Sequence, residues 1–315
     1  MRPVRSPGTQ RGVALITAVL MVALATILAV EIGFAGYLDQ RRSATLFALD
    51  QSYMVALGAE AWAADVLRED LEQTKTDHAA ERWATPIPPL PIDGGEVEGF
   101  VEDLSGRFNL NSLVRSDGTI DEESVLRFAR ILEAVGLEPR WASMFADWLD
   151  VDSVPAFPDG AEDGVYNART PPYRTPNMPI TRTSELLALP EFGLERYQLI
   201  EPFVTALPIG TKLNVCTAPG VVLDALTEGT REFGIDPEGL ANNRTETCFP
   251  SLAELRGAFG EAEFRKLENQ LSETSQYFRA TIWVSIGTTR FTLYSLLNRN
   301  QTGLVRPMLR SFGTS

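Results

Sequence analysis

The sequence predicts an α+β fold that consists of a long N-terminal helix and a sheet interrupted by a large α-helical insertion. Three observations support this prediction. An uncharged apolar run near the N-terminus continues into an amphipathic helical pattern. Alternating strand patterns occur both upstream of residue 105 and close to the C-terminus. Helical periodicity dominates the residues between them, as expected for one sheet that carries an inserted domain.

The apolar run from Val13 to Val30 contains no charged residue, proline or glycine. As a helix it rises about 27 Å, which is enough to cross the hydrocarbon core of a membrane. Glu31 is the first charged residue after the run, and three arginines precede it, at positions 2, 5 and 11. Because basic residues resist translocation, we expect a cytoplasmic N-terminus and export of everything after Glu31.

The apolar pattern then continues from Leu46 to Leu71 at alternating three- and four-residue steps. This spacing marks one face of a helix, so we expect a continuous helix of about 90 Å with a bend at Gly33 and Gly36. We expect the apolar stripe to pack against helices of partner chains. The alternative is a cleaved signal peptide, for which Gly33-Phe34-Ala35 offers a small-x-small site.

Length, charge and histidine content exclude several classes of function. The 315 residues are enough for two cores, or for one core with a large insertion. The formal net charge is −14, and loss of a leader with three arginines would take it to −17. So acidic a surface disfavours nucleic acid and anionic membranes and suits cations or basic partners. The chain has one histidine, His78, which disfavours Ser-His-Asp catalysis and multi-histidine metal sites, and we expect His78 to be a surface residue.

Both cysteines, Cys216 and Cys248, lie in the part of the chain that is expected to be exported. An even number of cysteines in an oxidising compartment favours a disulfide, and no histidine lies near either cysteine to form a zinc site. Closing a loop of about 33 residues would stabilise the fold by about 3–4 kcal/mol in the chain-entropy model.

Residues 73–95 are polar and then rich in proline and glycine, so we expect a loop that leaves the long helix. Short strands are expected at 96–104 and 108–110, on either side of the turn signal Ser105-Gly106.

Helices are expected throughout residues 105–205. The first opens at Asp121 with acidic residues in its first turn, the second is Pro139–Leu149, and the third begins near Thr183. The loop between the last two spans about thirty residues, which is too long for a passive connection. We therefore assign 105–205 to an inserted helical domain.

The C-terminal part begins with a short helix expected at Val221–Leu226. The end of the chain reads as a hairpin, because residues 278–286 alternate between apolar and polar side chains and 290–297 return after a glycine turn. We expect 76–104 to form the first part of the sheet and 206–315 the second part, with the disulfide.

The segment 147–163 contains six carboxylates among prolines and a glycine. Such a loop, rich in oxygen donors and without histidine or cysteine, suits calcium. Asp150 and Asp152 can point at one ion, and Glu162 and Asp163 could close the site from the far end. The spacing is not that of an EF-hand. Two alternatives stay open: a solvated acidic loop that binds nothing, and a carboxylate pair for glycoside hydrolysis.

The N-terminus resembles that of type IV prepilins and pseudopilins, because a short basic leader ends in Gly12 and Val13-Ala14-Leu15-Ile16 opens an unbroken apolar helix. The resemblance implies cleavage after Gly12 by prepilin peptidase and methylation of the new amino group on Val13. Residues 1–12 would then be the leader, and 13–75 the transmembrane and amphipathic helix.

One departure from the pilin pattern is informative. Most members have glutamate at the fifth mature position, where this chain has Thr17. In those proteins the glutamate is thought to neutralise the terminal amine of the subunit above. A subunit at the very tip needs no such carboxylate, and Thr17 avoids the cost of a carboxylate in lipid.

The resemblance extends over the chain to the type II secretion system protein K family. The residues that carry it lie mainly in the insertion: Asp147-Trp148-Leu149-Asp150-x-Asp152, Gly160-Ala161-Glu162-Asp163, Tyr166, Pro172-Tyr173-Arg174, Asn177, Ser184-Glu185-Leu186 and Leu213-Asn214…Thr217-Ala218. The stretch 213–226 also faintly resembles a helix-hairpin-helix element, which the acidic charge and expected export make a packing motif rather than a DNA-binding one.

This resemblance implies a minor pseudopilin with the pseudopilin fold, in which the long helix packs on an antiparallel sheet. It implies a place at the tip of the periplasmic pseudopilus with minor pseudopilins I and J, above the pseudopilus body. The inner-membrane assembly platform would be a further partner. A structural Ca²⁺ near the acidic loop is implied as well, with Asp150, Asp152, Glu162 and Asp163 as candidate ligands.

Three classes of function therefore compete. The first is a structural tip subunit with no enzymatic activity. The second is a membrane-anchored, calcium-dependent exported hydrolase, for which we find no catalytic constellation. The third is a pilus-linked nucleic-acid binder, which needs a basic patch that the composition does not favour. Only the first accounts for Gly12-Val13, Thr17 and the continuous helix together.

Overall fold

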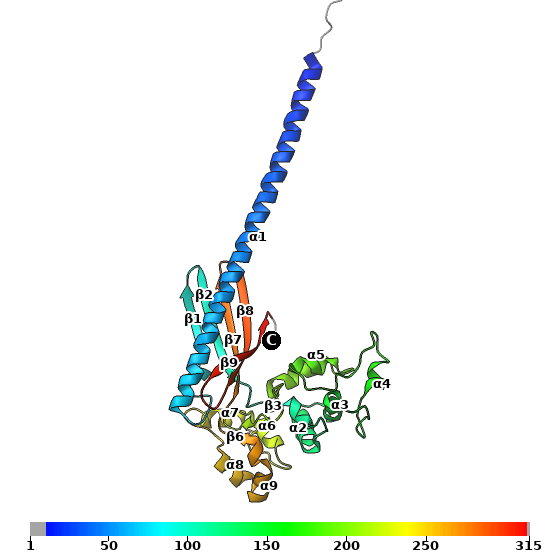
Figure 1. Ribbon diagram of the computed structural model, residues 1–315, viewed down its shortest axis with the longest axis vertical. Coiled ribbons are helices and arrows are strands. Elements are labelled where there is room, and N and C mark those ends of the chain that lie inside the picture. The colour runs from blue at the N-terminus through cyan, green and yellow to red at the C-terminus, as the bar shows by residue number, and fades with distance from the viewer. Residues whose placement is uncertain (1–10, 314–315) are drawn as a thin grey trace, which may run out of the picture.

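The computed structural model describes residues 11–313, with side chains from Gly12 onward. The predicted leader arginines at positions 2 and 5 lie outside the described residues. One helix, α1 (Arg11–Gln73), spans most of the length of the molecule, and its second half belongs to the head (Figure 1). The helix is not interrupted at Gly33 or Gly36, because a glycine keeps its backbone hydrogen bonds and lowers helix stability by only about 1 kcal/mol.

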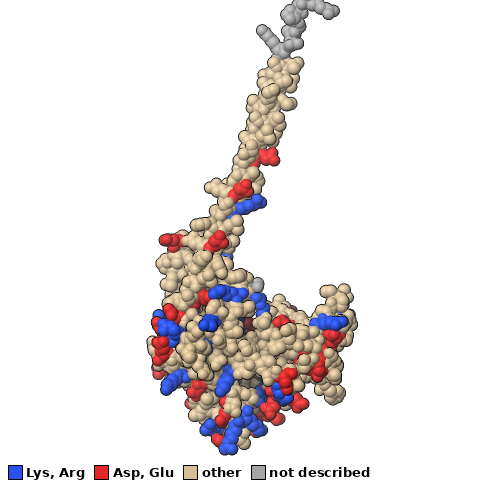
Figure 2. Space-filling model, in the orientation of Figure 1, with Lys and Arg blue, Asp and Glu red and all other residues tan. Residues whose placement is uncertain are grey.

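The first half of α1 extends away from the head as an exposed apolar rod. Figure 2 shows its outer part almost free of charged side chains, whereas the head carries many of both signs. Within the described residues α1 is the one helix long and apolar enough to cross a membrane, and its most apolar window is not buried at all. Large apolar side chains fully exposed over this length suit a lipid environment.

The second half of α1 packs on a five-stranded antiparallel sheet in the order β1-β2-β7-β8-β9. The two central strands, β2 and β7, come from opposite sides of the insertion and pair in continuous register from Gly95↔Ile286 to Asp103↔Phe278. The strands are β1 (Ile87–Ile92), β2 (Gly95–Asp103), β7 (Tyr277–Ile286), β8 (Thr289–Arg299) and β9 (Val305–Phe312).

The apolar stripe of α1 faces this sheet, which corrects the expectation that it packs against partner helices. Ala56, Ala63 and Leu67 are buried against β7 and β8, in a core that includes Phe278 and Leu297. Small side chains on the helix let it approach the sheet closely. The apolar side chains left exposed on α1 in this region are Leu46, at the start of the stripe, and three residues outside it, Phe47, Met54 and Trp62.

The inserted domain leaves the sheet after Asp103 and builds its own core from helices α2, α3 and α5 and the connecting loops. Its elements are β3 (Phe108–Asn109), the 3₁₀ turn η2 (Leu110–Leu113), α2 (Glu122–Ala134), α3 (Arg140–Leu149), α4 (Asp163–Tyr166), η3 (Thr183–Ala188), α5 (Gly193–Ile200), η4 (Glu201–Phe203) and β4 (Val204–Thr205). β3 pairs with β4 in parallel, so it is not part of a hairpin with β2.

A buried asparagine closes the insertion on itself. The Asn111 side chain donates to the carbonyl oxygens of Ile180 (2.9 Å) and Leu207 (2.8 Å) and accepts from the Ile180 backbone N–H (2.8 Å). These three bonds join segments about 70 and 96 residues away, so the start of the insertion is tied to the end of the loop after α3 and to the exit of the insertion.

The sheet resumes only at Tyr277, so the predicted boundary of its second part at residue 206 differs from the structure. The residues in between form a third small core around Val215, Leu255 and Phe264. Its elements are β5 (Leu213–Asn214), α6 (Gly220–Ala225), α7 (Pro237–Asn243), α8 (Leu252–Phe259), α9 (Glu261–Leu267), η5 (Glu268–Gln270) and β6 (Leu271–Ser272). Helices of six to eight residues are too short to show a clear period in sequence.

The disulfide lies in this third core. Cys216 and Cys248 are bonded, with 4.6 Å between their Cα atoms, and Cys216 is fully buried. A core this small gains from a covalent link, because few apolar side chains are available to it.

Candidate metal site

The acidic loop begins where α3 ends, at the outer end of the inserted domain near α4 (Figure 1). The side chain of Asp147, in the last turn of α3, is fully buried and accepts a hydrogen bond from the backbone N–H of Ala156 at 3.0 Å. Gly160 lies against the same carboxylate, and an added Cβ there would come within 2.3 Å of Asp147 Oδ2. Asp147 and Gly160 thus hold the loop closed over the end of the helix.

Three of the predicted ligand residues meet in this loop. Asp150, Asp152 and Glu162 each offer one carboxylate oxygen, and these oxygens lie within 4.8 Å of one another. Asp150 and Glu162 are buried, whereas Asp152 is exposed. An aromatic pair flanks the acidic segment: Trp148, in the last turn of α3, packs edge-on against Tyr166 of α4.

Two of these carboxylates have buried oxygens without a hydrogen-bond partner, Asp150 Oδ1 and Glu162 Oε1. Buried polar atoms are nearly always paired, so unpaired oxygens call for an explanation such as an ion. Within the described part of the chain, no lysine or arginine forms an ion pair with Asp147, Asp150, Asp152 or Glu162.

Burial and mutual repulsion raise the pKa values of Asp147, Asp150 and Glu162. Burial raises the pKa of Asp150 to about 7, and the charges of Asp152, Asp147 and Glu162 add to this effect. Burial likewise raises the pKa of Asp147 to about 6, and it raises the pKa of Glu162. A divalent cation among these oxygens would offset both causes.

The fourth predicted ligand, Asp163, lies beside the cluster but is engaged elsewhere. Its Oδ1 accepts from the backbone N–H and the hydroxyl of Thr175, both at 3.2 Å, and Arg174 lies 3.8 Å from its other oxygen. The Thr175 hydroxyl also lies 3.2 Å from Glu162 Oε2, so Thr175 links the two neighbouring acids.

Asn177 also lies at this site, and it is not among the predicted ligands. Its amide donates to the carbonyl oxygen of Asp152 at 2.8 Å, and its Oδ1 is buried without a partner. Its backbone has a positive φ of 49°, a conformation that asparagine tolerates better than most residues. Asn177 is among the residues that carry the family resemblance, but only the contact with Asp152 places it beside the acidic cluster.

The donor set fits a hard cation. Carboxylate and amide oxygens on an irregular loop, without nitrogen or sulfur ligands, match the preference of calcium for six to eight oxygens at flexible geometry. Asp150, Asp152 and Glu162 would hold the ion, and Asn177 could supply a neutral oxygen.

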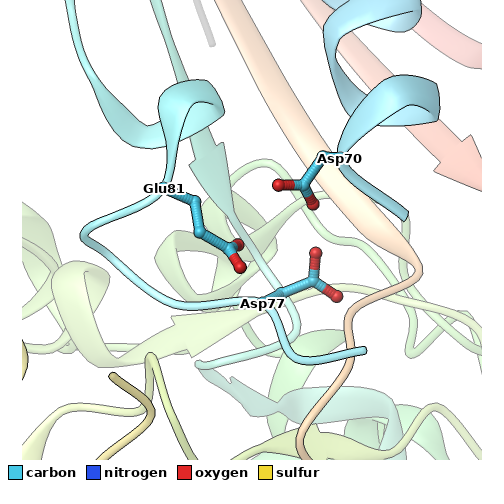
Figure 3. Close-up of side chains that lie close together, drawn as sticks. All are labelled: Asp70, Asp77 and Glu81. Carbon is cyan, nitrogen blue, oxygen red and sulfur yellow. The ribbon is translucent and has the colours of Figure 1, made fainter. Parts of the chain in front are cut away.

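A second cluster of three carboxylates lies where α1 meets the sheet, and no motif in the sequence predicts it. Asp70, Asp77 and Glu81 point toward one another (Figure 3), and one oxygen of each lies within 4.8 Å of the others. Here a cation is already present: the Arg299 guanidinium pairs with Asp77 and lies 3.1 Å from Asp70 Oδ2. Arg299 already compensates part of the negative charge of this cluster, so the cluster gives no reason to invoke a metal ion.

The single histidine belongs to this second cluster, so its expected place on the surface is wrong. The His78 side chain is only 12% exposed, and its Nε2 lies 3.5 Å from Glu81 Oε1. The polar residues around His78 form a loop that folds back under α1, and the sequence alone does not show this burial.

At the other end of the molecule, the predicted processing site lies at the start of α1. Gly12 and Val13 are helical and exposed. The Thr17 hydroxyl donates to the carbonyl oxygens of Val13 (3.1 Å) and Ala14 (3.0 Å) within its own helix. Thr17 therefore presents neither a charge nor a free donor to a neighbouring helix.

Comparison with known proteins agrees with this architecture. The family described as "Type II secretion system (T2SS), protein K" matches residues 106–209, which is almost the whole insertion. Type II secretion system protein K of Pseudomonas aeruginosa is 36% identical over 96% of this chain and 93% of its own length. The Klebsiella pneumoniae protein of the same name is 32% identical over 92% and 93%, respectively.

A solved structure shows the same fold. It is the GspK-GspI-GspJ complex of the enterotoxigenic Escherichia coli type 2 secretion system, of which one chain superposes with a TM-score of 0.76 at 22% identity. The superposition covers 87% of this chain and all of the other. The sequence matches, which cover more than nine-tenths of this chain and of both relatives, establish that this chain belongs to the type II secretion system protein K family.

Proposed function

We propose that this chain is a minor pseudopilin that caps the tip of a type II secretion pseudopilus, in complex with minor pseudopilins I and J. The observation that carries the proposal is the position of the inserted domain and of the third core that follows it. Together they are about 170 residues that leave and re-enter the sheet between the paired strands β2 and β7, so the bulk of the head lies beside and below a pilin-like helix-and-sheet frame (Figure 1).

This bulk argues for a terminal place in the fibre. A helical filament repeats one contact between identical subunits at a fixed rise. A head that carries two further cores next to its sheet would collide with copies of itself in such a stack. Thr17 adds a second argument, because it lacks the charge that would register a subunit under its predecessor.

The exposed apolar half of α1 supports a single membrane span before assembly. In the proposed orientation the N-terminus lies in the cytoplasm, prepilin peptidase cleaves between Gly12 and Val13, and the head lies in the periplasm. The inner-membrane assembly platform and the pseudopilus body would be its other partners. Mass analysis of the mature protein should find methylated Val13; a terminus near Gly36 would contradict this processing.

The acidic loop is proposed to hold a structural Ca²⁺ through Asp150, Asp152 and Glu162. Asp163 is the fourth candidate, and it would have to exchange Thr175 for the ion. The support is the pair of unpaired buried oxygens in a loop without a compensating cation. The proposed role of the chain is structural and not enzymatic; the alternative remains a calcium-dependent exported hydrolase.

The tip assignment is tested by assembly. The protein should join minor pseudopilins I and J as a single species with one copy of each in size-exclusion chromatography with light scattering, and it should form no filaments alone. Filaments of this protein by itself, or repeated copies along a labelled pseudopilus, would contradict the assignment. Hydrolysis of a secreted substrate by the purified protein would favour the alternative.

A further inference from the structure

The second carboxylate cluster lies at a junction of four chain segments. Arg299, at the end of β8, is 1% exposed and donates to the carbonyl oxygens of Leu67 (2.9 Å) and Ser275 (3.1 Å). The same guanidinium pairs with Asp70 on α1 and with Asp77 on the loop that follows α1. One side chain thus joins the end of α1, the loop 74–86, the start of β7 and the end of β8.

Hydrogen bonds to Asp77 and Glu81 hold the loop 74–86 in place. The backbone N–H of Ser275 donates to Asp77 Oδ2 at 2.7 Å, and the backbone N–H of Asp77 donates to the carbonyl oxygen of Glu273 at 2.8 Å. Glu81 Oε2 accepts from the indole N–H of Trp83 at 2.7 Å. The position of the loop therefore depends on these carboxylates remaining in place.

The charges of this junction do not balance when every acid is ionised. Asp70, Asp77 and Glu81 face one guanidinium, that of Arg299. The other titratable groups that face the cluster are His78, on the loop, and the buried carboxylate of Asp103, at the end of β2. Asp103 is itself satisfied by the hydroxyls of Ser275 and Thr217 and the amide of Asn214.

A proton is the smallest cation that can correct this imbalance. The guanidinium already lies against Asp70 and Asp77, so a metal ion at the same oxygens would have to sit against a positive charge. A proton needs no additional space and adds a donor where two carboxylates meet. Glu81 Oε1, which has no hydrogen-bond donor, lies within 3.5 Å of the His78 imidazole.

We propose that this cluster is a proton-operated latch, in which a proton held between Asp70 and Asp77 fastens the head to the end of α1 and its loss loosens that junction. The direction of the pKa of Asp70 agrees with this assignment. Burial, together with the charges of Glu81 and Asp77, raises the pKa of Asp70 to about 7 against the opposing effect of Arg299.

The sign of the pH dependence follows from linkage. The folded protein holds this proton at a higher pH than the unfolded chain does, whose aspartate has a pKa near 3.8. Stability from this group is therefore complete at low pH and is lost as the pH rises from about 4 to about 7. The junction should be tight in mildly acidic medium and looser in alkaline medium.

The test compares full-length protein in detergent with the variant Asp70→Asn. The amide of asparagine keeps the shape of protonated aspartic acid and can both accept from Arg299 and donate to Asp77. The melting temperature of the wild type should fall between pH 5 and pH 8 by at least about 2 °C more than that of Asp70→Asn. The difference between the two proteins isolates Asp70 from the other acids of the chain.

Two controls and a local readout accompany this test. Asp65→Asn removes an exposed carboxylate on the same helix that pairs only with Arg68, and it should keep the wild-type slope. His78→Gln separates the contribution of the imidazole. In the wild type, hydrogen exchange at the Asp77 and Ser275 amides, corrected for intrinsic rates, should be faster at pH 8 than at pH 5.

Equal slopes for the wild type and Asp70→Asn would overturn the proposal. So would a loss of stability in Asp70→Asn that is the same at pH 5 and pH 8, because that is the signature of a fixed ion pair. If Asp70→Asn does not fold, the exchange measurement on the wild type decides alone, and protection of the two amides that is independent of pH contradicts the latch.

Discussion

The two carboxylate clusters of this protein have the same size and a different balance of charge. In each, three acids bring one oxygen apiece within 4.8 Å. At the junction of α1 and the sheet, Arg299 lies among the acids, and Asp77 is fully paired. In the loop after α3 no cationic side chain of the described chain pairs with the three acids, and two buried oxygens lack partners.

The comparison teaches that the number of acids does not identify a metal site. The absence of a compensating cationic side chain is the better indicator, because a buried carboxylate must find a cation, a proton or a set of donors. An unpaired oxygen alone does not separate the clusters, because Glu81 Oε1 of the inner cluster also lacks a donor. Arg299 reaches Asp77 across 222 residues of sequence, so the inner cluster holds distant parts of the fold together. The acids of the loop lie within 13 residues of one another, so an ion there would order a local segment.

The largest effect is expected when the inner cluster loses its cation. Arg299→Met keeps much of the side-chain volume but leaves buried carboxylates without a partner, which costs about 3–5 kcal/mol in comparable cases. We expect a corresponding loss in the free energy of unfolding measured by urea denaturation at pH 7.

The matched control is Arg290→Met, on the same strand. Arg290 is exposed and lies 3.5 Å from Glu98, so its loss should cost about 1 kcal/mol or less. A loss in Arg299→Met no larger than in this control would show that Arg299 does not compensate the inner cluster.

A smaller effect, on calcium affinity, is expected at the loop cluster, where protons and calcium compete for the same oxygens. Burial and neighbouring charges raise the pKa of Asp150 to about 7, so at pH 5.5 an ion must displace a proton that is mostly absent at pH 7.5. Calcium should therefore bind roughly tenfold more weakly at pH 5.5, as measured by calorimetry. Asp159→Asn, an exposed acid of the same loop, should leave this ratio unchanged. Equal affinities at the two pH values would argue that Asp150 is not a ligand.

Much of the fold could be predicted from local patterns. The apolar run after Gly12, the stripe on α1, the helix after Asp121 and the hairpin at 278–297 all appear where the periodicity places them. Sequence patterns do not predict β1, because three of its six residues are prolines, which are tolerated at a sheet edge but lack a backbone donor. The helix expected from Thr183 is only a 3₁₀ turn, followed by α5 after a separate start at Gly193.

Of the two carboxylate clusters, one could be predicted from local sequence and the other could not. Asp150, Asp152 and Glu162 could be found because they are close in sequence and share one chemistry. The inner cluster could not, because Asp70, Asp77 and Arg299 come together only when β8 has paired with β7 and α1 has packed on the sheet. A local sequence pattern cannot predict a contact between residues that are 222 positions apart.

The difference between the clusters can be measured directly by the calcium that full-length protein binds in equilibrium dialysis at pH 7.5. The account predicts that the wild type binds calcium, that the double variant Asp150→Asn/Glu162→Gln does not, and that Asp70→Asn/Glu81→Gln binds as much as the wild type. Loss of calcium from the Asp70→Asn/Glu81→Gln variant, or full binding by the Asp150→Asn/Glu162→Gln variant, would contradict it.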